Sequence, residues 1–168
     1  SCVTGAIGSL RGPLHGGANE AAMEMIQGFT SPEHAEQEMM GKLERKEKIM
    51  GFGHAVYSES DPRNEIIKQW SEKLAADVGD KVLYPVSVRC EEVMWREKKL
   101  FCNADFFHAS AYNFMGIPTK LFTPIFVMSR LTGWAAHVME QRADNRIIRP
   151  SAEYTGEELR TVTPIAER

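Results

Sequence analysis

The chain has 168 residues, of which 43% are hydrophobic and 26% charged, a composition that can build a core and is typical of a globular protein. Its formal net charge of -3 argues against a broad nucleic-acid-binding surface, which needs clustered positive charge. No stretch approaches the roughly 20 apolar residues that span a bilayer, and the spacing of Cys2, Cys90 and Cys102 forms no disulfide framework, which fits a reducing compartment.

Apolar residues recur at the spacing of α-helices along most of the chain, and we find no alternating strand pattern longer than a few residues. A capping residue followed by proline marks a helix start twice, at Ser31-Pro32 and at Asp61-Pro62. The predicted fold class is therefore all-α. The predicted helices cover residues 1–10, 18–27, 32–46, a segment after 62, 82–100, 104–115 and 124–143, and a polar tail follows residue 145.

His15 stands between a Gly-Pro break and two glycines, directly before a predicted helix. Glycines allow the backbone to approach a ligand closely, and the positive end of a helix disfavours the imidazolium form. A neutral imidazole there could donate a hydrogen bond to a developing enolate oxygen. The same residues also fit an incidental histidine in a loop that starts a helix.

The segment Gly51-Phe52-Gly53-His54 predicts a tight loop whose exposed N–H groups could contact a phosphate or an adenine, although it matches neither a P-loop nor a dinucleotide-binding fingerprint. His54 could polarise a ketone, and Arg63, nine positions later, could hold a carboxylate through two hydrogen bonds. The alternative is a turn followed by a capped helix with an exposed arginine.

Asp105 lies among aromatic residues, where the pKa of a carboxyl group can rise and the group can act as a base. The alternative is that Asp105 caps the helix that starts there. Arg130 falls within an apolar helix, with no acidic residue three or four positions away, so we expect burial and a distant or ligand anion as partner. The alternative is a side chain that reaches solvent. Since the histidines form no metal-binding pair, no metal site is expected.

Several segments together resemble the citrate synthase family in order and spacing. They are GPLHGGANEA at 12–21, GFGHAVY at 51–57, DPR at 61–63, NADFFHASAYNFMG at 103–116, SRLTGWAAHVMEQ at 129–141 and IIRP at 147–150. The intervening VMWREKKLF and the DNRIIRPSAEYTG tail are most similar to the 2-methylcitrate synthase branch. The resemblance implies condensation of propionyl-CoA with oxaloacetate and water to give 2-methylcitrate and CoA. The alternatives are citrate synthesis from acetyl-CoA, and a helical interaction module without catalysis.

The resemblance also implies roles for individual residues. Asp105 would take the α-proton of the acyl-CoA, His15 would stabilise the enolate, and His54 would polarise the ketone of oxaloacetate. The dicarboxylate would be held by Arg63 and Arg130, with Arg149 reaching across a dimer interface. Coenzyme A would lie against the loop Gly51, Phe52 and Gly53, with Lys98 and Lys99 near its phosphates.

By the same resemblance, residues 1–12 would end a large-domain helix, 13–108 would form the small, CoA-binding domain, and 109–168 would return to the large domain and the C-terminal tail. We expect a cytoplasmic homodimer with no permanently bound cofactor, no metal, and neither a nucleic acid nor a membrane as partner. Ser1 already lies in a predicted helix, so we expect a piece of a longer protein. Because the family's N-terminal half carries a further oxaloacetate-contacting histidine, this piece alone should have little or no activity.

Overall fold

The computed structural model describes residues 1–12 and 14–168, and Pro13, the predicted first residue of the small domain, lies outside the described residues. All regular elements of the described part are helices, and a single isolated β-bridge joins Phe52 to Cys102, so the all-α prediction is confirmed. The α-helices are α1 (Cys2–Leu10), α2 (Ala18–Gln27), α3 (Pro32–Glu44), α4 (Asn64–Val78), α5 (Leu83–Lys98), α6 (Ala104–Phe114) and α7 (Phe122–Ala143), with 3₁₀ turns η1 (Thr119–Leu121) and η2 (Ile165–Glu167).

Two proline-linked helix starts, predicted from the same signal, have different outcomes. The hydroxyl of Ser31 accepts a hydrogen bond from the backbone N–H of His34, with Pro32 in the first helical position, so this cap is confirmed. Asp61 does not cap α4, whose N-cap residue is Arg63. The carboxylate of Asp61 accepts a hydrogen bond from the N–H of Arg63 at 3.0 Å, and its other contacts are with the candidate site, which is described below.

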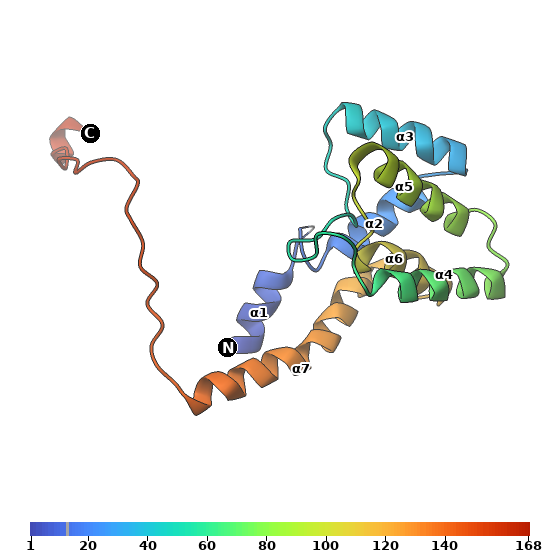
Figure 1. Cartoon of the computed structure of the whole chain (residues 1–168). Coiled ribbons are helices and arrows are strands. Elements are labelled where there is room, and N and C mark those ends of the chain that lie inside the picture. Colours follow the sequence, from blue (N-terminus) through green and yellow to red (C-terminus); the bar gives the residue numbers. More distant parts are fainter. Residues whose placement is uncertain (13) are drawn as a thin grey trace.

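The core lies inside a bundle of α2 to α6, in which α4 packs on α6 and α3 packs on α5 (Figure 1). Its largest buried side chains come from α2, α3, α5, α6 and the first residue of α7, Phe122, and Phe106 and Phe107 of α6 meet edge to face at 5.2 Å between ring centroids. Such aromatic pairs add to the stability that burial provides. This rigid packing holds the first turn of α6, which carries Asp105, in place.

Helix α1 lies against α7, and α7 leads away from the bundle into the extended C-terminal segment (Figure 1). Within α7 only Phe122 is buried, whereas Met128, Leu131 and Met139 are exposed. The apolar stripe predicted for this helix therefore faces outward in this chain. Among the described residues, no helix combines the length and the apolar character needed to cross a membrane.

Candidate active site

Two loops and the starts of two helices, α2 and α6, line a cavity of about 550 Å³ that contains the three residues predicted to carry the chemistry. His15 comes from the loop before α2, His54 from the loop before α4, and Asp105 from the first turn of α6. The remaining lining residues are Leu14, Ala18, Lys48, Ile49, Met50, Gly51, Phe52, Gly53, Ala55 and Asn103. The predicted CoA-binding segment 51–53 thus lies in the same cavity as His15, His54 and Asp105.

The loop that carries His15 is held by close backbone packing at Gly16. Its N–H donates to the carbonyl of Leu10 at 2.8 Å, and its carbonyl accepts a hydrogen bond from the hydroxyl of Thr123 at 3.2 Å. A Cβ at this position would lie 2.0 Å from Cδ2 of Leu10, so only glycine fits without a shift of its neighbour. The glycine that follows His15 therefore fixes where this loop meets α1.

The loop that carries His54 is tied to the start of α6. The N–H of Gly53 donates to the carbonyl of Phe101 at 2.8 Å, and the N–H of Asn103 donates to the carbonyl of Gly51 at 3.0 Å. The Asn103 side chain donates to the carbonyl of Gly53 and accepts from the N–H of Asp105, which makes Asn103 the N-cap of α6. The alternative that Asp105 is the cap is therefore wrong, and its carboxyl group is not used for capping.

The close fit of Gly51 against α6 leads to a testable expectation. Gly51 has φ +90, and a Cβ there would lie 2.8 Å from Cδ2 and 3.0 Å from Cβ of Phe106. We expect Gly51→Ala to lower the free energy of unfolding by roughly 1–3 kcal/mol, because it adds a steric clash to the backbone strain. Gly79→Ala is the matched control, since Gly79 has φ +72 and no atom within 4 Å of the added Cβ. If thermal unfolding shows the same decrease in the free energy of unfolding for both variants, the contact with Phe106 does not have the role assigned to it.

The hydrogen bonds of His54 determine which of its ring nitrogens can donate. Nδ1 accepts from the backbone N–H groups of Val56 at 3.0 Å and Tyr57 at 3.2 Å, and the ring stacks on Tyr57 at 4.5 Å. A nitrogen that accepts carries no proton, so the proton of the neutral ring lies on Nε2. Nε2–H is then available to donate to an oxygen in the cavity.

Asp105 has the electrostatic environment of a base. Burial raises the pKa of its carboxyl group, and the charge of Asp61 acts in the same direction, while Arg63, His15 and His54 oppose the rise. The pKa remains above that of an ordinary aspartate, which makes the carboxylate a stronger proton acceptor. The groups that oppose the rise in the pKa of Asp105 are Arg63, His15 and His54, which the family resemblance assigned to the same site.

A second cavity, of about 300 Å³, also has Asp105 in its lining and is formed by residues of α2, α6, α7 and the start of α4. Arg63 and Arg130, the two arginines expected to hold a dicarboxylate, both line it. The other lining residues are Asn19, Ala104, His108, Tyr112, Phe122, Phe126 and Ser129. Asp105 is therefore shared by the cavity that contains His15 and His54 and the cavity that contains the two arginines.

Arg63 is anchored by Asp61, a residue that sequence reasoning took for a helix cap. The two carboxylate oxygens of Asp61 accept from Nε of Arg63 at 2.9 Å and from Nη2 at 2.7 Å, and Oδ2 also accepts from the N–H of Ala104. Burial would raise the pKa of Asp61, but the hydrogen bonds from Arg63 and Ala104 outweigh it and lower the pKa. One buried carboxylate thus fixes both the guanidinium and the start of α6.

Arg130 differs from the prediction in its burial. Its side chain is exposed, and its guanidinium lies over the ring of Phe126 at 5.0 Å. The expectation of a buried arginine is wrong because α7 lies at the surface of this chain, where water solvates the charge. Among the residues that the structure describes, Arg130 makes no ion pair, so its guanidinium is available to an anion in the second cavity.

Three predicted binding residues line neither cavity. Arg149 lies exposed in the segment after α7, and Lys98 and Lys99 lie exposed at the end of α5, where the ammonium group of Lys99 is 5.6 Å from the Trp95 ring centroid. Lys48, which sequence reasoning missed, lines the loop cavity instead. The position of Lys48, a basic residue just before the glycine-bearing loop 51–53, was the sequence signal that could have identified it as a candidate binding residue.

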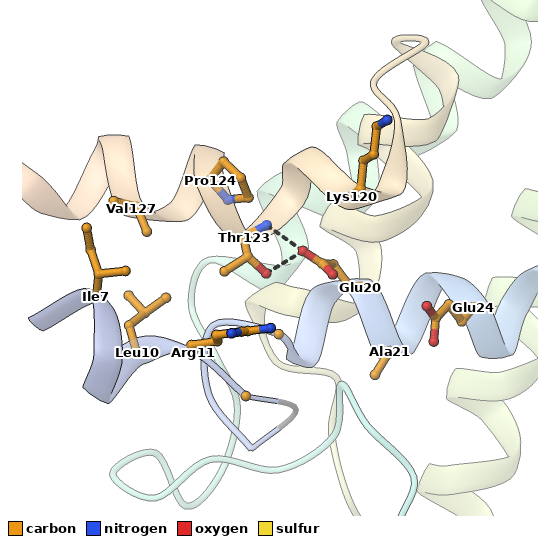
Figure 2. Close-up of a pocket in the computed structure, with 12 residues that line it drawn as sticks. Ile7, Leu10, Arg11, Glu20, Ala21, Glu24, Lys120, Thr123, Pro124 and Val127 are labelled. Atoms are coloured by element: carbon orange, nitrogen blue, oxygen red, sulfur yellow. Dashed lines mark hydrogen bonds between the residues drawn. The ribbon is translucent and has the colours of Figure 1, made fainter. Parts of the chain in front are cut away.

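A third hollow, of about 530 Å³, is lined by residues of α1, α2, η1, α7 and the loop between α1 and α2, and it contains none of the predicted site residues (Figure 2). The Glu20 carboxylate accepts hydrogen bonds from the N–H and the hydroxyl of Thr123 there. This contact attaches the start of α7 to α2 and so helps to place Arg130 at the second cavity. Throughout the described ranges, no group of three or more His, Cys, Asp or Glu side chains is arranged to hold a metal ion.

Comparison with known proteins gives consistent matches. The family model for the citrate synthase C-terminal domain matches residues 1–151. The whole chain is 76% identical to 45% of a 2-methylcitrate synthase of Shewanella oneidensis, and 50% identical to 45% of citrate synthase 2 of Bacillus subtilis. It thus spans about half the length of these relatives. A ternary complex of Thermoplasma acidophilum citrate synthase with carboxymethyl coenzyme A and oxaloacetate superposes with a TM-score of 0.89 at 36% identity, over 99% of this chain and 46% of that one.

Proposed function

This chain belongs to the citrate synthase family, and we propose that it forms part of a 2-methylcitrate synthase, which condenses propionyl-CoA with oxaloacetate and water to give 2-methylcitrate and CoA. The observation that carries the proposal is the shared cavity of His15, His54 and Asp105, together with the second cavity that Asp105 shares with Arg63 and Arg130. The propionyl-CoA preference is supported by the 76% identity to a relative named 2-methylcitrate synthase.

In this proposal, Asp105 removes a proton from the α-carbon of the thioester while His15 donates a hydrogen bond to the enolate oxygen. The two act together because a thioester α-proton is a very weak acid. Nε2–H of His54 polarises the ketone, and Arg63 and Arg130 hold the carboxylates so that the ketone carbon lies within reach of the nascent carbon nucleophile. A new C–C bond forms, and hydrolysis of the thioester adduct then releases CoA.

The remaining parts of the proposal follow the family resemblance. Coenzyme A would lie along 51–53 beside Lys48, with Lys98 and Lys99 nearby on the surface. Arg149 would act in the site of a second protomer of a cytoplasmic homodimer, which agrees with its exposed position. Residues 13–108 would form the small domain and 1–12 and 109–168 would belong to the large one. With half of the relatives' length present, this chain alone should show little or no turnover.

A citrate synthase that uses acetyl-CoA is the second candidate, supported by the 50% identity to the Bacillus subtilis enzyme. The two substrates differ by one methylene group, which is worth about 1–3 kcal/mol of discrimination. We expect kcat/KM of the full-length protein to be at least about tenfold higher with propionyl-CoA than with acetyl-CoA. A preference for acetyl-CoA would instead establish the second candidate, and no turnover with either would favour an interaction module.

A further inference from the structure

The tyrosine that ends the segment 51–57 has no role in the proposed mechanism, yet its ring lies against two groups that do. The ring of Tyr57 stacks on the imidazole of His54, with 4.5 Å between ring centroids and 30° between the ring planes. The guanidinium carbon of Arg63 lies over the same ring, 5.8 Å from its centroid. Tyr57 lines neither of the two cavities, so any effect on the substrate passes through His54 and Arg63.

His54 and Arg63 need neighbours that hold them, because both are exposed in this chain, whereas Tyr57 is half-buried. An exposed side chain samples several rotamers, and fixing it at the moment of binding costs conformational entropy. Side chains that are already held in the binding orientation avoid this cost.

The imidazole of His54 is restrained by two kinds of contact with the residues that follow it. The backbone N–H groups of Val56 and Tyr57 donate to Nδ1, which fixes one corner of the ring. A ring held at one atom can still tilt about that atom, and the flat stack on Tyr57 opposes this tilt. The two contacts together set the direction of Nε2–H.

The guanidinium of Arg63 is held by Asp61 and by the Tyr57 ring. Asp61 accepts from Nε and Nη2, which occupies one edge of the planar fork. Since a guanidinium has five N–H donors, the edge formed by Nη1 and Nη2 can still receive a carboxylate. The ring attracts the cation through its electron-rich face and so limits how the fork can swing.

Oxaloacetate makes the relative placement of these two groups important. Its ketone carbon is bonded directly to a carboxylate carbon, so covalent geometry fixes the distance between the ketone oxygen and that carboxylate. We propose that Tyr57 is a positioning residue that sets the orientation and spacing of His54 and Arg63 for this one molecule. The inference rests on the proposed function, in which the imidazole polarises the ketone and the guanidinium holds a carboxylate.

Tyr57→Leu in the full-length protein removes the ring but keeps the backbone N–H that donates to His54 and leaves the pair of Asp61 and Arg63 intact. We expect KM for oxaloacetate to rise at least about tenfold. KM for propionyl-CoA, measured with oxaloacetate at saturation, should stay within about twofold of wild type. Tyr57→Phe retains the ring and should keep both values close to those of wild type.

A spectroscopic measurement at saturating oxaloacetate separates positioning from a merely structural role. In ¹³C NMR of oxaloacetate labelled at the ketone carbon, wild type should move the bound signal downfield from its free position, because a polarised carbonyl carbon is electron-poor. Tyr57→Leu should lose at least about half of this displacement, and Tyr57→Phe should retain it. A change that only destabilised the fold would leave the signal of the folded, saturated protein unaltered.

Trp70→Leu is the matched control, since it removes a ring on α4 that the ammonium group of Lys73 approaches to 4.9 Å and that lines neither cavity. It should alter neither the KM values nor the NMR signal. Tyr57→Met also lacks a flat ring and decides the test if Tyr57→Leu does not fold.

Three results would overturn the positioning role of Tyr57. They are an unchanged KM and ketone signal in Tyr57→Leu, a parallel rise of both KM values, and equal losses in Tyr57→Leu and Tyr57→Phe. If oxaloacetate bound to the wild-type protein gives the signal of the free keto-acid, His54 does not polarise the ketone. In that case the proposed function itself fails, which is distinct from a wild-type displacement that Tyr57→Leu leaves intact.

Discussion

Asp105→Asn should lower kcat for the condensation by roughly 10²–10⁴-fold, the contribution expected of a general base. Asparagine has nearly the same shape but cannot take the α-proton, so α-hydrogen exchange should fall by the same factor. Steady-state turnover of the full-length protein and exchange into D₂O measure the two rates. Asp77→Asn, at an exposed position of α4, makes the same chemical change far from both cavities and should leave both rates unchanged.

The same substitution should make the protein more stable at neutral pH. The folded-state pKa of Asp105 is raised by burial, so its charged form is held less well in the folded than in the unfolded chain. This lowers stability above the folded pKa and has no effect below the ordinary pKa of about 4. Asp105→Asn should therefore raise the midpoint of denaturant unfolding at pH 7 but not at pH 3. Lower stability at pH 7 together with lost activity would mean that Asp105 is mainly structural.

Asp61→Asn should weaken both the fold and the binding of the keto-acid. An amide nitrogen in place of one carboxylate oxygen would face N–H donors of Arg63 and Ala104 instead of accepting from them. A buried donor left without an acceptor costs about 1–3 kcal/mol of folding free energy. The guanidinium of Arg63 also loses the carboxylate that holds it in place. For this reason kcat/KM for oxaloacetate should fall at least about tenfold, mainly through a higher KM. An unchanged KM would show that the Asp61 contact does not position Arg63 for the substrate.

The pH dependence gives an independent check on Asp61. Its folded-state pKa is lowered, because hydrogen bonds from Arg63 and Ala104 outweigh the effect of burial. The resulting stability is present above the ordinary pKa of about 4 and is lost as the pH falls through the folded-state pKa. The stability advantage of wild type over Asp61→Asn should therefore shrink on acidification from pH 7, as measured by denaturant unfolding. A stability advantage of wild type that grows as the pH falls would contradict a lowered pKa for Asp61.

Helix positions could be predicted from the sequence because they depend on local patterns. Apolar spacing and the Ser31-Pro32 cap place α3 without knowledge of the rest of the fold. Asp61-Pro62 carries the same local signal but belongs to a different structure, because the Asp61 carboxylate contacts Ala104, 43 residues away. Contacts of that kind depend on how α4 and α6 pack, and no spacing rule gives them.

The candidate site was only partly predictable for the same reason. The glycines beside His15 and His54 identified these two histidines as candidates. Asn19 and His108, by contrast, lie within helices and look like ordinary helical residues until α2 and α6 are packed together. Arg130 was expected to be buried because its neighbours in sequence are apolar. Its exposure reflects the place of α7 at the surface of this chain, which composition alone does not determine.

A crystal structure of the full-length protein, with oxaloacetate and an unreactive thioether analogue of the acyl-CoA, tests the shared site most directly. We expect the keto-acid to contact Arg63, Arg130 and Nε2 of His54, and the analogue to lie along 51–53. Its α-carbon should be within about 3–3.5 Å of the Asp105 carboxylate, the distance at which transfer of the proton is direct. Ligands bound outside both cavities, or an α-carbon remote from Asp105, would contradict the account.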